Sequence, residues 1–294
     1  MKAVVIGANG QLGVDVCRVL TGHSVDMLPI THRDLDVTDS GLVEQALEKI
    51  QPDVVISTAA FHKVEECEKL PALSFEVNAI GPRNVAHACR RIDAALVHFS
   101  TDYVFSGARR QPHTETCLPE PLNVYGVSKL AGEAMLASAW ERHFVVRTCG
   151  LYGLAGSSGK GGNFVELMLK KARESAPIRV VNDQVLTPTF TSDLAEVVWQ
   201  LIQTKAYGLY HASAEGECSW YDFARKIFEL EGLQVDVEPV SSDEFPSSVK
   251  RPAYSVLSKQ KLSKLGIEIP SWDDGLRRYL LARRQVHGTP ALTA

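Results

Sequence analysis

Tyr125 and Lys129 lie four positions apart, and their types and spacing permit proton chemistry. On a helix, residues at this spacing share one face and lie one turn apart. A cation beside a phenol favours the phenolate, so such a tyrosine can exchange a proton near neutral pH. The spacing is common in helices. The functional interpretation of this pair therefore depends on two other motifs. One is a glycine-rich turn near the N-terminus, and the other is a Ser-Thr pair that lies between that turn and Tyr125 in the sequence.

The glycine-rich turn follows the first apolar run and precedes a helical pattern. Glycine permits a sharp turn, a close approach of the backbone to a pyrophosphate and close packing of the helix on the sheet. The N–H groups and the positive end of the helix then favour phosphate oxygens. A purely structural turn is the alternative, and the position at the start of a βα alternation weakens it. The residues assigned to cofactor binding here are Gly7, Asn9, Gly10, Gln11, Leu12 and Gly13.

The end of the second expected strand bears on the choice between NAD and NADP. Thr31, His32 and Arg33 stand there, and none is an acidic residue that would bind the adenosine ribose hydroxyls. Arg33, together with His32, can meet a 2′-phosphate, which favours NADP; a solvated Arg33 is an equal alternative. Asp36 and Val37 are expected to flank the adenine as an acceptor and an apolar wall.

Two hydroxyl residues, Ser100 and Thr101, stand at the end of a strongly apolar run that reads as a strand. In a doubly wound sheet the ligand crevice lies beyond the carboxyl ends of the strands. Both hydroxyls are therefore expected near the phosphate-binding turn. Ser100, Thr101 and the following Asp102 are also common turn formers, and from these residues alone that alternative stays open.

The pattern of the first half predicts the elements that must position these residues. Short apolar runs alternate with amphipathic stretches, which indicates an α/β fold with a doubly wound parallel sheet. Their content of Val, Ile and Ala suits strands buried on both faces. Strands are expected at Lys2–Ile6, Val25–Leu28, Asp53–Ser57, Ala94–Ser100 and Phe144–Thr148, and helices at Gln11–Leu20, Ser40–Lys49, Pro71–Arg91 and Asn123–Trp140.

The pattern changes after about Gly150. Gly153–Gly162 holds five glycines and two serines, which favours a flexible loop. Helices are then expected at Asn163–Ser175, Ser192–Thr204, Tyr221–Glu231, Ser258–Leu265 and Trp272–Arg284, with short strands at Ile178–Val181 and Gly208–His211.

These elements suggest two interleaved regions. Residues 1–150 are expected to form a dinucleotide-binding Rossmann domain, to which residues 183–212 or thereabouts return. Residues 151–182 and 213–285 are expected to form a smaller α/β substrate-binding region, and residues 286–294 a frayed tail.

Composition narrows the classes of partner. With 31 Lys and Arg against 35 Asp and Glu, the formal charge of −4 gives no reason to expect nucleic acid or an anionic membrane. No apolar run reaches transmembrane length and no signal peptide is evident, so the expected location is the cytoplasm. The six cysteines are scattered without a C-x-x-C pair, which favours reduced, buried thiols over a zinc site or disulfides.

Several motifs together resemble one family. The chain resembles the extended short-chain dehydrogenase/reductases, and among them it is most similar to the dTDP-4-dehydrorhamnose reductases. The match is densest over residues 1–150 and continues through most of the rest. The motifs that carry it are G-x-x-G-x-x-G, Ala59-Ala60, Asn78, Ser100-Thr101-Asp102-Tyr103-Val104-Phe105, Tyr125-Gly126-Val127-Ser128-Lys129, Gly162-Asn163-Phe164, Asp183-Gln184, Pro188-Thr189 and Arg251-Pro252-x-x-Ser255.

The resemblance implies roles for the catalytic set. Thr101, Tyr125 and Lys129 match the family's catalytic residues. Tyr125 would donate a proton to the C4 carbonyl oxygen of a sugar as hydride arrives from NADPH or NADH. Lys129 would hold the nicotinamide ribose and keep the phenol acidic, and Thr101 would hydrogen-bond the oxygen that gains charge. Ser100, Ala59, Ala60 and Asn78 match the cofactor cleft, with a backbone-bonded amide as the alternative for Asn78.

The same resemblance implies a long substrate that bears a pyrophosphate. The residues matched to substrate binding are Asp102, Tyr103, Cys149, Asn163, Gln184 and Arg251. Arg251 best suits a nucleotide phosphate, and a solvated arginine is its equal alternative.

The chain departs from the family pattern at two places. Cys149-Gly150 stands where a bulky aromatic is usual, and Phe61-His62-Lys63 replaces a Tyr-Thr pair and the residue after it. His62 and Lys63 are possible substrate contacts, although an exposed loop pair is the more frequent outcome. These changes preserve the hydride chemistry and leave the sugar open.

The implied function is reduction of the 4-keto group of a nucleotide-linked deoxysugar, with a homodimer as a possible assembly. The alternatives are another nucleotide-sugar epimerase or oxidoreductase, and a non-catalytic NADP-binding regulatory subunit like that of methionine adenosyltransferase. A dehydratase usually has Asp-Glu after the threonine, whereas Tyr103 follows Asp102 here. Some family members hold Mg²⁺ at a dimer interface, and Asp15 falls at one matching position, but no metal is assigned.

Overall fold

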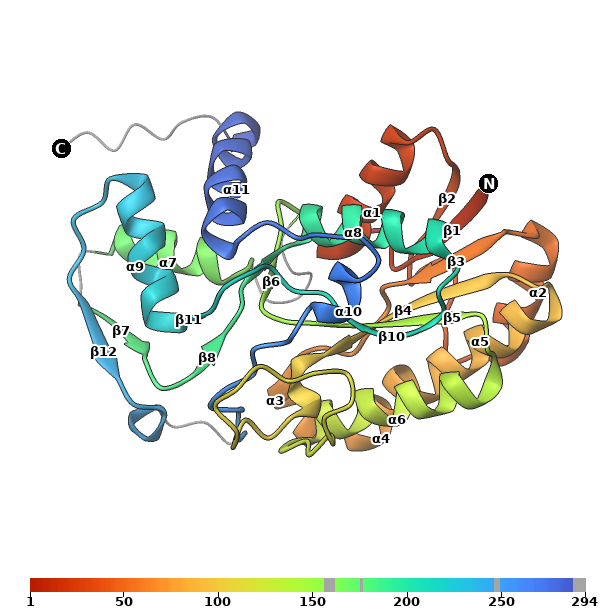
Figure 1. The fold of residues 1–294 in the computed structure, drawn as a ribbon, viewed down its shortest axis with the longest axis horizontal. Coiled ribbons are helices and arrows are strands. Elements are labelled where there is room, and N and C mark those ends of the chain that lie inside the picture. Colours follow the sequence, from red (N-terminus) through yellow and green to blue (C-terminus); the bar gives the residue numbers. More distant parts are fainter. Residues whose placement is uncertain (156–161, 175–176, 246–248, 288–294) are drawn as a thin grey trace.

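A six-stranded, wholly parallel sheet forms the centre of the computed structural model, in the order β10-β5-β4-β3-β1-β2 (Figure 1). The structure describes residues 1–155, 162–174, 177–245 and 249–287. The sheet strands are β1 (Lys2–Ile6), β2 (Asp26–Ile30), β3 (Val54–Ser57), β4 (Ala95–Thr101), β5 (His143–Thr148) and β10 (Gly208–His211).

Helices cover both faces of this sheet, as the apolar content of the strands predicts. Alternate residues of β1 show the division: Ala3 and Val5 pack into one core, and Val4 and Ile6 into the other. The first core contains α1 (Gln11–Gly22) and α8 (Thr191–Thr204), and the second contains α2 (Ser40–Ile50), α5 (Gly81–Arg91) and α6 (Val124–Ala139). Figure 1 shows these two layers above and below the sheet. The doubly wound α/β fold is therefore confirmed.

The helical stretch predicted at 71–91 is interrupted by one π-helical turn. It consists of α4 (Pro71–Phe75), the π-turn η1 (Glu76–Ile80) and α5. The sequence pattern also missed a short helix before it, α3 (Val64–Lys69). A π-turn inserts one residue into the helical ladder, a change that apolar periodicity does not reveal.

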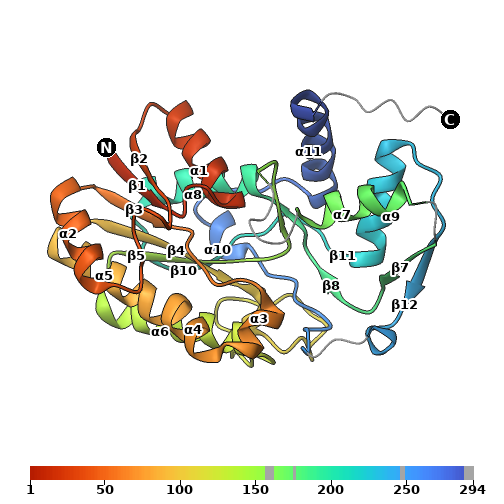
Figure 2. The same ribbon diagram turned by 180° about the vertical axis from the view of Figure 1, so that it is seen from behind.

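A second group of elements packs around its own apolar cluster, beside the carboxyl ends of the sheet strands (Figure 2). Its aromatic residues include Tyr152, Phe223 and Tyr279. The elements that supply this cluster are β6 (Leu151–Tyr152), α7 (Phe164–Ala172), β7 (Ile178–Val181), β9 (Thr189–Phe190), β11 (Cys218–Ser219), α9 (Trp220–Glu231), β12 (Val237–Val240) and α11 (Trp272–His287). The remaining elements are β8 (Val185–Leu186), α10 (Gln260–Ser263), whose Leu262 packs in the first core, and the 3₁₀ turns η2 (Asp102–Val104) and η3 (Ser242–Glu244).

The C-terminal tail and the glycine-rich loop are described only in part. Helix α11 runs to His287, and the rest of the expected tail, 288–294, lies outside the described residues. Of the expected glycine-rich loop, residues 156–161 also lie outside them. Among the described helices, none combines the length and the apolar character that a bilayer crossing requires.

Candidate active site

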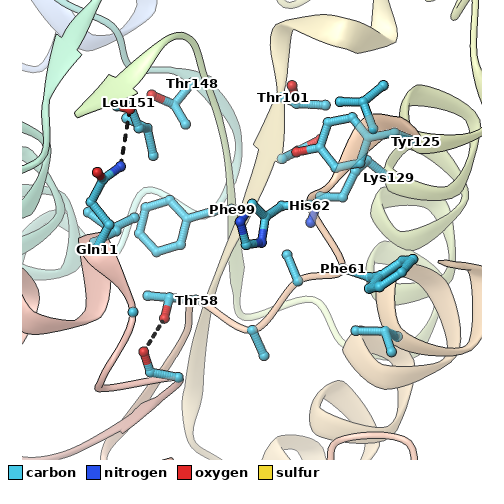
Figure 3. A pocket seen from close by; sticks show the side chains of 18 of the residues that line it. Gln11, Thr58, Phe61, His62, Phe99, Thr101, Tyr125, Lys129, Thr148 and Leu151 are labelled. Atoms are coloured by element: carbon cyan, nitrogen blue, oxygen red, sulfur yellow. Dashed lines mark hydrogen bonds between the residues drawn. The ribbon is translucent and has the colours of Figure 1, made fainter. Parts of the chain in front are cut away.

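A cavity of about 1150 Å³ lies at the carboxyl ends of the sheet strands and extends towards the second group of elements. Its walls contain residues from the glycine turn, from the ends of β3 and β4, and from α6 and α7. Figure 3 shows Thr101, Tyr125 and Lys129 on one side of it and Gln11 and Thr148 on the other, with His62 projecting into the middle. The structure therefore brings together the three motifs that lie far apart in the sequence.

The glycine turn forms the end of the cavity next to β1. Gly7 has a φ of +80°, a conformation that glycine adopts without strain. Gly13 packs so closely on the turn that a Cβ would lie 2.2 Å from the Gly7 carbonyl oxygen. Gly10 caps α1 without a side chain, which leaves the first N–H groups of the helix facing the cavity end where Gly10, Gln11 and Leu12 line it. This arrangement suits a pyrophosphate.

Two buried side-chain atoms in the cavity wall lack a hydrogen-bond partner in the part of the chain that the structure describes. Gln11 donates through Nε2 to the Leu151 carbonyl at 3.1 Å, but its Oε1 is unpaired. The Thr148 hydroxyl is also buried and unpaired. Unpaired buried polar atoms are costly, so these two atoms fit a wall completed by a polar ligand. Thr148 was not predicted as a site residue.

Of the four residues expected to bind the adenosine part of the cofactor, three line the cavity and one does not. His32, Asp36 and Val37 line the cavity, whereas Arg33 is exposed and does not. The Asp36 carboxylate accepts from the backbone N–H and the hydroxyl of Thr38 at 2.9 and 2.8 Å, and these bonds lower the pKa of Asp36. Its second oxygen is not engaged by these bonds, so Asp36 can still accept from a ligand.

Ala59 and Ala60 lie in the cavity wall after β3, but Asn78 lies behind it. Asn78 Oδ1 accepts from the Phe61 N–H at 2.9 Å, and Nδ2 donates to the Phe61 carbonyl at 2.9 Å and to Ser128 Oγ at 3.1 Å. This is the backbone-bonded amide considered as an alternative from the sequence. Asn78 thus orders the wall and does not itself line the cavity.

Helix α6 positions Tyr125 and Lys129. It begins after Asn123, whose side chain accepts from the Gly126 N–H at 2.9 Å. A Cβ at Gly126 would lie 2.3 Å from the Tyr103 carbonyl oxygen, so a glycine is needed for this close approach to η2.

The pKa shifts of the pair differ from the sequence expectation. Burial raises the pKa of the Tyr125 phenol, and a hydrogen bond from Thr101 opposes that shift. Burial also lowers the pKa of Lys129 to about 8, against a smaller opposing effect of Glu133. The ammonium contacts His98 Nε2 at 3.2 Å. Burial, and not Lys129, is therefore the main influence on the pKa of this phenol, contrary to the expectation that Lys129 keeps it acidic.

Ser100 and Thr101 have different partners. The Ser100 hydroxyl donates to Glu133, which forms a buried ion pair with Arg147 at 2.6 Å. Thr101 Oγ1 lies 3.0 Å from Asp102 Oδ1 and accepts from the Tyr103 N–H at 3.2 Å. Ser100 thus has its proton engaged by protein, although it lines the cavity.

Five of the six residues matched to substrate binding line the same cavity, and the sixth does not. Asp102, Tyr103, Cys149, Asn163 and Arg251 line the main cavity, whereas Gln184 lines a small adjoining cavity. The Asn163 side chain is engaged as the cap of α7 and by the Gly153 carbonyl and the Tyr279 hydroxyl.

Arg251 pairs with Glu65, which joins the C-terminal segment to the first turn of α3. Lys63 pairs with Glu66 at 2.9 Å and does not line the cavity, whereas His62 does.

The second group of elements adds a wall that sequence reasoning missed. Phe164, Leu167 and Lys170 come from α7 and Trp220 from α9. The rings of Phe164 and Trp220 lie 4.6 Å apart between centroids. Phe164 stands in a motif that carries the family resemblance, whereas nothing local in the sequence indicates Trp220, because α7 and α9 are far apart in the chain.

No metal centre accompanies the cavity in residues 1–155, 162–174, 177–245 and 249–287: no group of three or more His, Cys, Asp or Glu side chains is arranged to hold an ion. Asp15 is buried and accepts from Thr191 Oγ1 at 2.5 Å and from Arg18 at 3.1 Å.

The parallel sheet, the glycine turn and the Tyr125–Lys129 pair define an extended short-chain dehydrogenase/reductase. The family model described as RmlD substrate binding domain matches residues 1–284, and the chain belongs to that family.

Individual relatives cover nearly the whole chain. The spore coat polysaccharide biosynthesis protein SpsK of Bacillus subtilis is 40% identical over 96% of this chain and 98% of its own. The dTDP-4-keto-6-deoxy-D-glucose reductase of Streptomyces niveus is 36% identical over 93% and 94%. The crystal structure of dTDP-4-dehydrorhamnose reductase from Bacillus anthracis in complex with NADP superposes with a TM-score of 0.91 at 40% identity, over 96% and 99%.

Proposed function

We propose that the protein reduces the 4-keto group of a dTDP-linked deoxysugar with NADPH or NADH, and that the substrate is dTDP-4-dehydro-L-rhamnose. The observation that carries this proposal is the convergence of Thr101, Tyr125 and Lys129 in one cavity with the glycine turn. A relative named for the dTDP-4-dehydrorhamnose reaction, with NADP bound, supports the choice of substrate and cofactor.

The chain's residues fit a nicotinamide dinucleotide. The glycine turn offers N–H groups at the start of α1, and the unpaired Gln11 Oε1 offers an acceptor in the wall. Asp36 and Val37 line the same cavity and are the residues that would hold the adenine. When bound, the cofactor would supply the hydride, and the protein's side chains would orient the reactants and supply the proton.

Tyr125 is the proton donor in this proposal. Because burial raises the pKa of its phenol, the group carries its proton throughout the neutral range and can give it to a carbonyl oxygen that gains charge. Thr101 hydrogen-bonds the phenol and places a second hydroxyl beside the reacting oxygen. Lys129, which is buried one turn along α6, is assigned to orient the ribose.

The sugar is tested by offering two substrates to the purified protein. Consumption of NADPH or NADH with dTDP-4-dehydro-L-rhamnose, followed through the nicotinamide absorbance, is expected to exceed that with dTDP-4-keto-6-deoxy-D-glucose. The second sugar is included because a relative is named for it and because Cys149, which lines the cavity, stands where the family that the chain resembles usually has a bulky aromatic. Preference for the second sugar would overturn the substrate. No turnover of either, with tight NADPH binding, would favour the regulatory-subunit alternative.

A homodimer, a cytoplasmic location and a preference for NADP over NAD stay predictions from the sequence.

A further inference from the structure

His98 lies within the central sheet, against the helix that carries Tyr125 and Lys129. It belongs to β4, and its side chain is completely buried. Because side chains alternate along a strand, His98 is on the same face as Leu96, which packs in the second core together with Leu136 of α6. An imidazole buried at this position loses its hydration and therefore requires a polar partner.

The polar partner is the Lys129 ammonium, whose Nζ lies 3.2 Å from His98 Nε2. Lys129 is also buried, with 2% of its surface exposed. An ammonium group has three N–H donors and no acceptor, so Nε2 must be the acceptor when Lys129 is charged. His98 is then a neutral imidazole that carries its proton on Nδ1. Its ionisation agrees with this assignment, because burial and the charge of Lys129 both lower the pKa of His98.

The other ring nitrogen of His98 makes no hydrogen bond. Nδ1 is buried and has no partner among residues 1–155, 162–174, 177–245 and 249–287. An unpaired buried polar atom is costly, so an imidazole that only filled space here would be a poor choice. Its contact with Lys129 is the one polar interaction that the ring makes with the described residues.

This contact leaves two N–H groups of Lys129 for a ligand. His98 is the one hydrogen-bond partner of Nζ within the described part of the chain. Glu133, the carboxylate one turn along α6, is paired with Arg147 at 2.6 Å and does not compete for the ammonium. Lys129 lines the cavity (Figure 3), whereas His98 does not, so the ammonium lies between a fixed acceptor and the cavity.

We propose that His98 positions the Lys129 ammonium for the ribose of the nicotinamide nucleotide by accepting one of its three N–H groups. A lysine side chain is long and flexible, and a fixed acceptor behind the ammonium directs its other two donors into the cavity. His98 touches no ligand and moves no proton, so it is a positioning residue. The inference rests on the proposed function, in which Lys129 orients that ribose.

The first test replaces His98 by residues of similar size that differ in the acceptor. The amide oxygen of His98→Gln can accept from Lys129, whereas the thioether of His98→Met is a weak acceptor. The Kd for NADPH and for NADH, measured by fluorescence titration, should rise about tenfold in His98→Met and stay within about twofold of wild type in His98→Gln. His23→Met, at the exposed C-cap of α1 and outside the cavity lining, should bind as wild type does.

Adenosine fragments separate positioning of Lys129 from a general disturbance of the fold. The fragments 2′,5′-ADP and ADP represent the adenosine ends of NADPH and NADH and lack the nicotinamide ribose. Their Kd should be unchanged in His98→Met. Equal losses of affinity for the fragments and the whole dinucleotides would overturn the proposal, as would unchanged binding of all four ligands. An affinity of His98→Gln for the dinucleotides as low as that of His98→Met would contradict it too.

An NMR measurement tests the contact without a change at position 98 and without turnover. Long-range ¹H–¹⁵N spectra at pH 7 should contain one histidine ring whose Nε2 resonance moves in Lys129→Met. That ring should carry a proton on Nδ1 and none on Nε2. A ring that is protonated on Nε2, or the lack of any ring that responds to Lys129→Met, would overturn the inference. If the binding and NMR results are as expected but neither sugar is reduced, the proposed function fails and the positioning role of His98 stands.

Discussion

The backbone of Gly132 in α6 packs directly against the carbonyl oxygen of Asn78 in η1, so closely that a Cβ at position 132 would lie 2.1 Å from that oxygen. Asn78 in turn bonds both polar backbone groups of Phe61 in the cavity wall. The helix that carries Tyr125 and Lys129 and the wall it faces are therefore fixed against the same π-turn.

Gly132→Ala tests this contact. Alanine normally stabilises a helix interior by about 0.5–1 kcal/mol relative to glycine. Here the added methyl group must displace α6 or η1, so we expect a loss of about 1–3 kcal/mol in the free energy of unfolding and a lower kcat. Gly22→Ala is the control, because a Cβ there has no neighbour within 4 Å. Wild-type stability and activity in Gly132→Ala would contradict the packing described.

Tyr125→Phe tests the proton donor. Removal of the phenol hydroxyl should lower kcat by about 10²–10⁴-fold, since it removes general acid catalysis while leaving the ring in place. Binding of NADPH, measured by fluorescence titration, should change little. Tyr221→Phe on α9, outside the cavity lining, should retain wild-type kcat. An active Tyr125→Phe enzyme would exclude the mechanism.

Lys129→Met tests the cost of the buried ammonium. Burial lowers the pKa of Lys129 to about 8 in the folded protein, from 10.5 for a solvated lysine, so the folded state releases its proton first as pH rises. Below about pH 8 the full cost of the buried charge is present, and it declines above that pH. The stability of the methionine variant relative to wild type should therefore fall by about 1–3 kcal/mol from about pH 7 to about pH 10. Melting curves at several pH values measure this.

Lys69→Met, at an exposed position of α3, is the control for that series. Its stability relative to wild type should be independent of pH in this range. A difference for Lys129→Met that is equally independent of pH would show that the ammonium is not desolvated.

Glu133→Gln tests the buried ion pair beneath the cavity. Glu133 and Arg147 have side-chain exposures of 9% and 3% and are joined at 2.6 Å. Loss of the carboxylate leaves a buried guanidinium without its counter-charge, which should lower the free energy of unfolding by about 3–5 kcal/mol. Urea denaturation measures this. Glu48→Gln, which breaks an exposed pair with Arg91, should cost less than about 1 kcal/mol. Equal effects of both changes would refute the argument.

Arg33→Ala tests the predicted preference for NADP. An arginine that meets a 2′-phosphate acts on NADPH alone, so KM for NADPH should rise about tenfold while KM for NADH stays constant. Initial-rate measurements with each cofactor decide this. Since Arg33 is exposed and outside the cavity lining, an unchanged KM for both would assign any preference to other residues such as His32.

Local sequence patterns predicted several elements well, because apolar runs, glycine positions and helical spacing are properties of short segments of the chain. The expected strands Lys2–Ile6, Ile178–Val181 and Gly208–His211 coincide with β1, β7 and β10. The glycine turn and α6 were also predicted, because glycine conformation and helical spacing are local properties. Short strands such as β6 and β9 were missed, since two-residue strands form through tertiary pairing and have no period to detect.

The roles of individual side chains were harder to predict, because they depend on partners far away in the chain. Ser100 turns to Glu133, and Asn78 turns to Phe61. The pKa of the Tyr125 phenol is determined mainly by its burial, which the spacing of Tyr125 and Lys129 in the sequence does not reveal. Residue type and position on the sheet identified the cavity; donor and acceptor assignments needed the structure.

The central sheet takes its last strand from far along the chain. Between β5 and β10 the chain builds β6 to β9 and α7, and α8 then covers the face that also holds α1. The core on that face contains residues from Ala3 to Ile269. A nascent chain that has emerged only to residue 150 would therefore have this face covered by α1 without α8, and β5 as an open edge, a surface prone to aggregation. We therefore expect the first half to become stably folded only after α8 and β10 have been synthesised.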